Sequence, residues 1–146
     1  MLYKVLRPDE YLLLKESYGL KATHPNSYTS VCNHVINKDV AEYQSPYILT
    51  CGSLSSVLKL RTAAQYQTAG IVQISEDNLP VAKIDLRTFS SRRKHYKLDT
   101  DNYDSINSFN NAAREYEMVL LVGHVPNMHV QLLSESDFNE EQLPVI

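Results

Sequence analysis

Apolar and polar residues alternate over Leu2–Leu6 at the start of the chain, and Pro8 follows. A period of two is typical of a strand with one buried face, and proline cannot donate a hydrogen bond to a sheet. The pattern therefore predicts a short first strand that ends before Pro8. Apolar residues at helical spacing then predict a helix over 10–17, capped by Asp9 and ended by Gly19.

The rest of the chain mixes helix-like and strand-like patterns. Apolar residues at helical spacing predict a helical or turn-like segment over 30–36 and a helix over 54–67. Residues 105–114 are expected to form a polar helix. Runs of β-forming residues predict strands over 47–50, 70–74, 81–86 and 117–122. These elements predict an α+β fold, with the helices mainly in the N-terminal half and the strands concentrated late.

Composition limits the number of domains and the class of partner. A chain of 146 residues that is 43% hydrophobic fits one core, and no repeat or linker divides it, so we predict a single domain over 1–146. The net charge of -3 does not favour nucleic-acid binding. The basic cluster Arg92–Lys97 is more typical of a solvated loop than of a phosphate-binding site, but a local contact with nucleic acid stays open.

The cysteines and the N-terminal residues bear on the compartment. Cys32 and Cys51 lack the spacing and the histidines of a zinc site, so two buried thiols are expected, with one disulfide as the alternative. Residues 1–11 carry charges where a signal peptide is apolar, and no apolar run is long enough to span a membrane. We predict a protein without membrane contact, either cytoplasmic or a secreted or injected effector.

The common catalytic motifs are missing from the sequence. It contains no G-x-G-x-x-G after a strand, no phosphate-binding P-loop, no H-E-x-x-H and no G-x-S-x-G. Dinucleotide-binding, nucleotide-hydrolysing, zinc-protease and serine-hydrolase functions therefore lack the motifs that carry them. A functional prediction has to come from the order of several weaker motifs.

Five short segments follow one another in a distinctive order. They are Leu2-Tyr3-Lys4, His34, Ser45–Cys51, Glu115-Tyr116-Glu117 and Gly123-His124-Val125-Pro126. This order resembles the ADP-ribosyltransferases of the cholera toxin and heat-labile enterotoxin A-chain type. In that family a Leu-Tyr-Arg strand, a histidine, a Ser-Thr-Ser strand, a Glu-x-Glu pair and a Gly-x-Ile-Pro turn follow one another. The resemblance covers nearly the whole chain, from Leu2 to about Pro126.

The resemblance implies transfer of ADP-ribose from NAD, with two glutamates in catalytic roles. Cleavage of the bond between nicotinamide and ribose builds positive charge on the sugar, and a fixed carboxylate stabilises that charge. Glu117 stands at the position of the catalytic glutamate. Glu115, two residues earlier, is expected to point along the same face of the strand and to serve as a base near the acceptor. By itself, such a pair of acidic residues is usually a solvated strand face.

The same resemblance implies a fold with two facing, mostly antiparallel sheets around an NAD cleft. Lys4 stands at the family's strand arginine, and Arg7 is a second cation, so both are expected to hold the NAD phosphates. His34 is expected to bond the ribose, and Thr50 is the one match to the Ser-Thr-Ser motif. Taken singly, Lys4 is better explained as an exposed strand residue, and His34 as a structural side chain. Together with Glu117, the cofactor-binding interpretation is favoured for His34 and equals the alternative for Lys4.

Two residues depart from the family pattern. Lys4 keeps the charge of the strand arginine but loses its planar set of donors. Leu49 replaces the first serine of the Ser-Thr-Ser motif, which braces the catalytic glutamate in the family, and an apolar side chain cannot form that hydrogen bond. Ser45, Ser53 or Arg7 are candidates to compensate for these changes.

The sequence is compatible with three functions. The first is a mono-ADP-ribosyltransferase of the toxin or effector type, acting on a protein or nucleic-acid acceptor, with an antitoxin or chaperone as a candidate partner. The second is a degenerate member of the same fold that binds a partner or nucleotide without catalysis. The third is an unrelated α+β binding module that uses its 10 tyrosines for recognition. In the first two cases, loops at 38–44 and 88–102 are expected to select the target.

Overall fold

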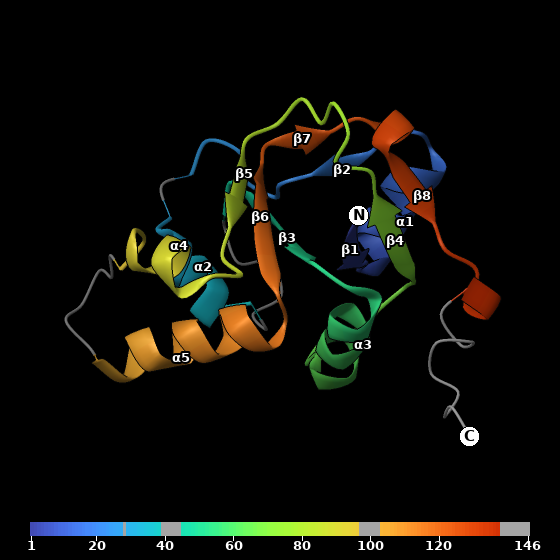
Figure 1. The fold of residues 1–146 in the computed structure, drawn as a ribbon. Coiled ribbons are helices and arrows are strands. Elements are labelled where there is room, and N and C mark those ends of the chain that lie inside the picture. The colour runs from blue at the N-terminus through green and yellow to red at the C-terminus, as the bar shows by residue number, and fades with distance from the viewer. Residues whose placement is uncertain (28, 39–44, 97–102, 138–146) are drawn as a thin grey trace, which may run out of the picture.

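The computed structural model describes residues 1–27, 29–38, 45–96 and 103–137 of the chain (Figure 1). Within these ranges it is an α+β structure with a six-stranded sheet and a two-stranded sheet. Its strands are β1 (Leu2–Val5), β2 (Leu20–Lys21), β3 (Tyr47–Cys51), β4 (Ile71–Ile74), β5 (Lys83–Asp85), β6 (Met118–Val122), β7 (His124–Val125) and β8 (Val130–Leu132). Its helices are α1 (Pro8–Lys15), α2 (Val31–Ile36), α3 (Leu54–Ala63), α4 (Phe89–Arg93), α5 (Tyr103–Glu115) and the 3-10 helix η1 (Asn127–His129).

The larger sheet has the strand order β5-β6-β3-β1-β4-β8, and all of its neighbouring strands are antiparallel. β3 pairs with β6 along its whole length, and β1 does the same with β4. In contrast, β1 and β3 share a single register pair, Tyr3 opposite Cys51. The sheet therefore consists of two three-stranded halves that are joined near Cys51.

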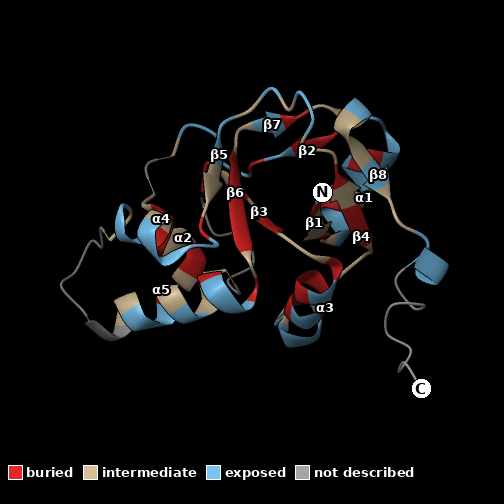
Figure 2. Cartoon of the chain, in the orientation of Figure 1, coloured by how far each residue is buried: buried red, intermediate tan, exposed pale blue. Residues whose placement is uncertain are grey.

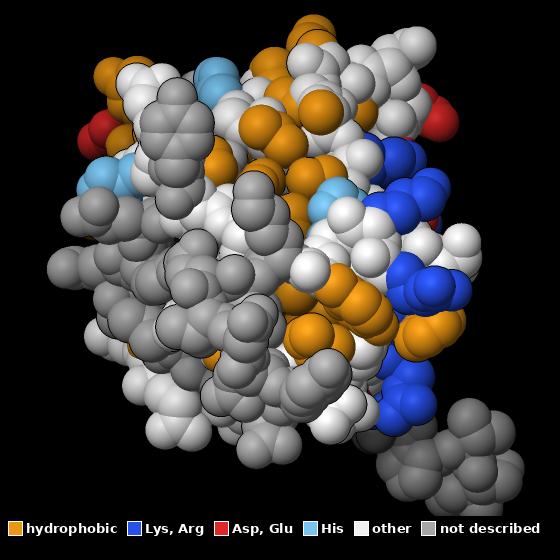
Figure 3. Space-filling model, turned by 90° about the vertical axis from the view of Figure 1, so that its left-hand side faces the viewer, with side chains coloured by type: hydrophobic (Ala, Val, Ile, Leu, Met, Phe, Trp, Pro, Cys, Tyr) orange, Lys and Arg blue, Asp and Glu red, His pale blue; other side chains and the backbone are white. Residues whose placement is uncertain are grey.

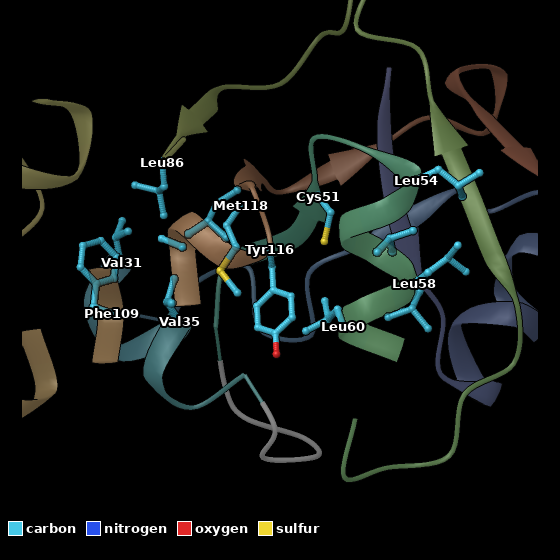
Figure 4. Close-up of a cluster of buried hydrophobic side chains, with 14 of the residues drawn as sticks. Val31, Val35, Cys51, Leu54, Leu58, Leu60, Leu86, Phe109, Tyr116 and Met118 are labelled. Atoms are coloured by element: carbon cyan, nitrogen blue, oxygen red, sulfur yellow. The ribbon is translucent and has the colours of Figure 1, made fainter. Parts of the chain in front are cut away.

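Helices α2, α3 and α5 cover one face of the six-stranded sheet. Phe109 of α5 is fully buried in the same cluster as Val31 and Val35 of α2, and Leu54 and Leu58 bring α3 into it (Figure 4). Burying a side chain of this size contributes about 2–3 kcal/mol to folding. This cluster fixes the start of α3 against the end of β3.

The opposite face of the sheet packs against α1 and the two-stranded sheet of β2 and β7. Its cluster joins Leu2 of β1 and Leu121 of β6 to Leu14 of α1 and to Leu20 and Val125 of the small sheet. Figure 2 shows the central strands β3 and β6 as largely buried between these layers. Both faces of the central strands are thus covered, which explains why β6 is apolar almost without interruption.

The structure confirms most of the predicted elements and corrects three points. Strands β1, β3, β4, β5 and β6 and helices α1, α2, α3 and α5 lie where patterning predicts them. However, α4, α5 and η1 lie in the second half, so the helices are not mainly N-terminal. Helix α3 ends at Ala63, short of the predicted end. Helix α1 begins at Pro8 with Arg7 as its N-cap residue instead of Asp9, because proline suits the first helical position and Glu10 accepts the Arg7 N–H at 2.9 Å.

The basic cluster at 92–97 is only partly a solvated surface. Arg92 lies on α4 with 6% of its surface exposed, and it donates to the side chain of Asn110 at 2.9 Å and to the Leu86 carbonyl at 3.0 Å. Arg92 is therefore a structural residue. Figure 3 shows Lys and Arg side chains along one edge of one face of the molecule. Lys97 lies outside the described residues.

Three further predictions can be compared with the structure. Cys32 and Cys51 are both buried thiols that form no disulfide, as the default prediction has it. No helix among the described residues has the length and apolar character needed to cross a bilayer. Of the two predicted target-selecting loops, residues 39–44 and 97–102 lie outside the described ranges, and the segment after Thr88 contains α4.

Candidate functional site

The three strands that carry the predicted motifs are neighbours in the sheet. β1 carries Lys4, β3 carries Leu49–Cys51, and Glu117 immediately precedes β6. Cys51 links them, since it is in register with Tyr3 on one side and with Met118 on the other. Segments far apart in the sequence are thus brought to one part of one sheet.

Glu117 occupies a turn between α5 and β6 in which its backbone is left-handed. Its φ is 47°, an uncommon value for a residue with a side chain. Its carbonyl accepts the Gly52 N–H at 2.8 Å, so Glu117 lies opposite the residue that follows β3. This turn directs the carboxylate to the N-terminus of α3, where one oxygen accepts hydrogen bonds from the hydroxyls of Ser53 and Ser56.

These neighbours keep the Glu117 carboxylate ionised. The hydrogen bond from Ser53, followed by that from Ser56, lowers the pKa of Glu117, and the cations of Arg87 and Lys59 lower it further, while partial burial opposes them. Ser53 is also the N-cap of α3 and accepts the Ser56 N–H at 3.1 Å. The start of α3 therefore stabilises a negative charge at a site where the side chain stays partly accessible.

Arg87 stands beside Glu117 and is held by Asp85. Its Nε and Nη2 donate to the two Asp85 carboxylate oxygens at 2.9 Å and 2.7 Å. A Cβ at Gly52 would lie 3.0 Å from Arg87 Cδ and 3.4 Å from Glu117 Cβ, so glycine gives both side chains room. We call Glu117, Ser53, Ser56, Gly52 and Arg87 the Glu117 cluster.

A groove opens where β1 and β3 separate, and we call it the β1–β3 groove. Its apolar part includes Val5 of β1, Leu60 of α3 and Tyr47 and Leu49 of β3. Its polar part includes Lys4, Arg7, Glu10, Lys21 and His34. Three of these, Lys4, Arg7 and His34, are predicted cofactor-binding residues. The structure thus brings Lys4, Arg7 and His34 together, with the replaced serine position, Leu49, in the same wall.

Part of the positive charge in this groove is already balanced. Lys4 Nζ lies 3.2 Å from Glu10 Oε2, and these side chains are only 12% and 9% exposed. Arg7 Nε lies 3.4 Å from Asp9 and 3.8 Å from Glu10. Lys4 is therefore a partly buried, paired cation and not an exposed strand residue.

His34 projects from α2 into the groove, and contacts with Ser45 and Tyr47 fix its ring. Its Nδ1 lies 2.6 Å from the Ser45 hydroxyl, and its ring packs edge-on against Tyr47 with 5.6 Å between centroids. Burial, with a smaller effect from the Lys4 cation, lowers the pKa of His34 to about 4. His34 is therefore uncharged at neutral pH.

Two predicted site residues do not take the expected positions. Glu115 is the last residue of α5, not a strand residue, and its exposed side chain does not share a strand face with Glu117. The helix continues through Glu115 because Tyr116 still donates to the Ala112 carbonyl, and the chain turns only at Glu117. Thr50 is fully buried and donates to the Val119 carbonyl at 2.6 Å, so it faces the core instead of a cofactor.

Glu117 and the groove lie at opposite ends of β3. The register puts Lys4 and Glu117 two strands and two residues apart, which is about 10 Å across the sheet and about 7 Å along it. Cys51 lies between them: burial raises its pKa to about 12, the Lys4 cation lowers it and the Glu117 charge raises it. Glu117 is not part of the groove wall.

Sequence analysis missed two members of the Glu117 cluster. Ser53 is a predicted candidate to compensate for the serine lost at Leu49, but Ser56 is not. The pattern Ser53-x-x-Ser56 at a helix start indicates two hydroxyls on one face, and both contact Glu117 in the structure. Arg87 follows a strand two residues after Asp85, a spacing that suits mutual pairing. Its position beside Glu117 comes from tertiary structure.

Comparisons of the chain with protein-family models, with curated proteins and with solved structures give no significant match. Within the described ranges, no group of three or more histidine, cysteine or acidic side chains is arranged to hold a metal ion. The function is therefore argued from the geometry of the site together with the resemblance in sequence.

Proposed function

We propose that this protein is an NAD-dependent mono-ADP-ribosyltransferase that modifies a protein or nucleic-acid acceptor. The observation that supports the proposal is the adjacency of β1, β3 and β6, which brings the three motif segments side by side in one sheet. A chance match of short motifs in sequence would not require them to meet in one sheet.

The chemistry of the side chains fits this substrate. Lys4, Arg7 and Lys21 supply positive charge to the groove for a diphosphate, and Tyr47 and Leu49 supply an apolar wall. The split between β1 and β3 is the cleft in which we propose that NAD binds. When bound, NAD supplies a ribose whose bond to the positively charged nicotinamide is easily cleaved.

Glu117 carries the catalytic step in this proposal. Its ionised carboxylate stabilises the positive charge that develops on the ribose as the bond to nicotinamide breaks. Ser53 and Ser56 fix that carboxylate and keep it deprotonated. A bond then forms between the ribose carbon and the acceptor, nicotinamide leaves with the bonding pair, and the proton of the acceptor passes to solvent. We assign no base to Glu115, because it is exposed on α5.

A second candidate is a non-catalytic binding protein with the same fold. It is favoured by two observations: the cation at the family's arginine position, Lys4, is already paired with buried Glu10, and Leu49 forms the wall where the family has a serine. Such a groove would bind a ligand through Arg7, Lys21 and His34 without fixing it for cleavage.

Release of nicotinamide from NAD, with water or an added acceptor, tests the proposal. We expect Glu117→Gln to lower the rate by about 100-fold or more, because the amide keeps an oxygen for Ser53 and Ser56 but loses the charge. Glu135→Gln, at an exposed glutamate, is the matched control and should release nicotinamide at the unchanged rate.

Two outcomes would contradict the proposal. Equal rates in the wild type and in Glu117→Gln would remove Glu117 from the mechanism. Binding of NAD to the wild type without any nicotinamide release, in the presence of protein and nucleic-acid acceptors, would favour the non-catalytic candidate.

A further inference from the structure

Ser45 is a buried hydroxyl that holds His34 from outside the groove. Ser45 is only 1% exposed. Its hydroxyl oxygen accepts the Tyr47 N–H at 3.1 Å and lies 2.6 Å from His34 Nδ1. Its backbone carbonyl accepts the His24 N–H at 3.2 Å. These bonds fix Ser45 two residues before β3, next to the imidazole.

The hydrogen bonds of Ser45 define which partner donates. A serine hydroxyl has one hydrogen and two acceptor positions, and the Tyr47 N–H already uses one acceptor position. If His34 Nδ1 carried a hydrogen and donated to Ser45, the buried hydroxyl hydrogen would have no acceptor among the described residues. Buried polar hydrogens are paired in nearly all proteins. Ser45 therefore donates to Nδ1.

We infer that Ser45 is a positioning residue that fixes His34 in the tautomer with its hydrogen on Nε2, so that His34 presents a hydrogen-bond donor to a substrate oxygen in the β1–β3 groove. A neutral imidazole has one donor and one acceptor nitrogen, and Ser45 occupies the acceptor. His34 lines the groove, whereas Ser45 does not. The identity of the substrate as NAD rests on the proposed function, but the tautomer does not.

The same geometry argues against a different use of this pair. A serine 2.6 Å from a histidine has the separation of a nucleophile and its base. Here the hydroxyl is buried outside the groove wall, so a substrate in the groove does not reach it. Ser45 is therefore not placed to act as a nucleophile.

Nuclear magnetic resonance of the full chain labelled with ¹⁵N-histidine tests the tautomer directly. At pH 7 and without ligand, we expect the His34 signals of a bare Nδ1 and a protonated Nε2, assigned by comparison with His34→Gln. Ser45→Thr, which keeps the hydroxyl, should retain this pattern. In Ser45→Ala both tautomers should be populated. A hydrogen on Nδ1 in the wild type would overturn the inference, whatever the variants do.

A kinetic measurement separates positioning from simple structural support. With Ser45→Ala we expect KM for NAD to rise about five-fold, the effect of one weakened hydrogen bond between neutral groups, while kcat stays within about two-fold. Ser45→Thr should restore KM. An unchanged KM in Ser45→Ala, or a loss confined to kcat, would contradict the positioning role.

The nicotinamide-release assay and the measurement of the His34 tautomer test the two proposals independently. If the wild type releases no nicotinamide but shows the Nε2–H tautomer, the proposed function is wrong and the inference on Ser45 stands. If nicotinamide release depends on Glu117 but His34 carries its hydrogen on Nδ1, the proposed function stands and the inference on Ser45 is wrong.

Discussion

The Glu117 cluster and the β1–β3 groove each contain a glutamate, and the two carboxylates are used in opposite ways. Glu117 accepts hydrogen bonds from neutral hydroxyls and has cations nearby without a direct ion pair among the described contacts. Glu10 is buried and lies 3.2 Å from the ammonium of Lys4. The charge of Glu117 stays available to a positive charge that forms beside it, whereas the charge of Glu10 is neutralised within the fold. Loss of Glu117 should therefore affect turnover, and loss of Glu10 should affect folding.

The largest effect on stability should come from Glu10→Gln. The amide still accepts the Arg7 N–H but leaves the Lys4 cation, which is only 12% exposed, without its partner, so the free energy of unfolding should fall by about 3 kcal/mol. Urea unfolding measures this change. Glu16→Gln, at an exposed glutamate just after α1, is the control.

The double variant Lys4→Met/Glu10→Gln sharpens this prediction. It removes the unpaired Lys4 cation as well, so it should recover part of the stability lost in Glu10→Gln. If Glu10→Gln unfolds at the same urea concentration as the wild type, the ion pair is not a structural element, and the contrast between the two glutamates is wrong.

A somewhat smaller effect should follow from pH at His34. Its pKa falls from 6.5 to about 4 on folding, so the unfolded chain takes up the proton first as the pH decreases. The contribution of His34 is complete above about pH 7 and is lost as the pH falls from 6.5 to 4, by about 3 kcal/mol at most. The free energy of unfolding measured across this range should lose that slope in His34→Gln.

His24→Gln is the control for this prediction, since it removes an exposed histidine from the same chain. A slope that survives in His34→Gln and disappears in His24→Gln would reassign the pH dependence. It would also mean that the imidazole of His34 is solvated, in contrast to its packing against Tyr47 and Ser45.

Patterning could predict the strands of the site but not the direction of every side chain. Alternation at Leu2–Leu6 and the apolar run before Glu117 are local signals, and β1 and β6 follow from them. Thr50 is different, because it matches the motif in sequence but shares the core face with Ile48. The motif gives the residue type, whereas the face depends on where the strand pairs.

The remaining features of the site could not be predicted from the sequence, because they depend on where a helix ends and on which residues meet in the tertiary structure. A polar helix over 105–114 and a strand from 117 leave Glu115 between them, and one more helical residue moves it from a strand face to a helix end. The strands β2 and β7 have two residues each, too few for a period to appear. Arg87 reaches Glu117 only because β5 pairs with β6 and Gly52 leaves room.

The smallest effect should separate the two serines of the Glu117 cluster. Ser53→Ala removes the N-cap of α3 and one donor to Glu117, whereas Ser56→Ala removes a donor and leaves the cap residue in place. We expect Ser53→Ala to lower the free energy of unfolding by about 1 kcal/mol, and Ser56→Ala to lower it less. Both variants should raise the pKa of Glu117, measured by carboxyl ¹³C resonance, because each removes a hydrogen bond to the ionised form.

The sign of this effect distinguishes a supported carboxylate from an ordinary helix cap. A carboxylate with a lowered pKa stabilises the fold above its unfolded pKa, and this contribution is lost as the pH falls through the folded pKa. The variants should therefore narrow the difference between stability at pH 7 and stability below pH 4. If neither variant moves the pKa of Glu117, the serines cap α3 without holding the carboxylate, and the charge of Glu117 has to be maintained by Arg87 and Lys59 alone.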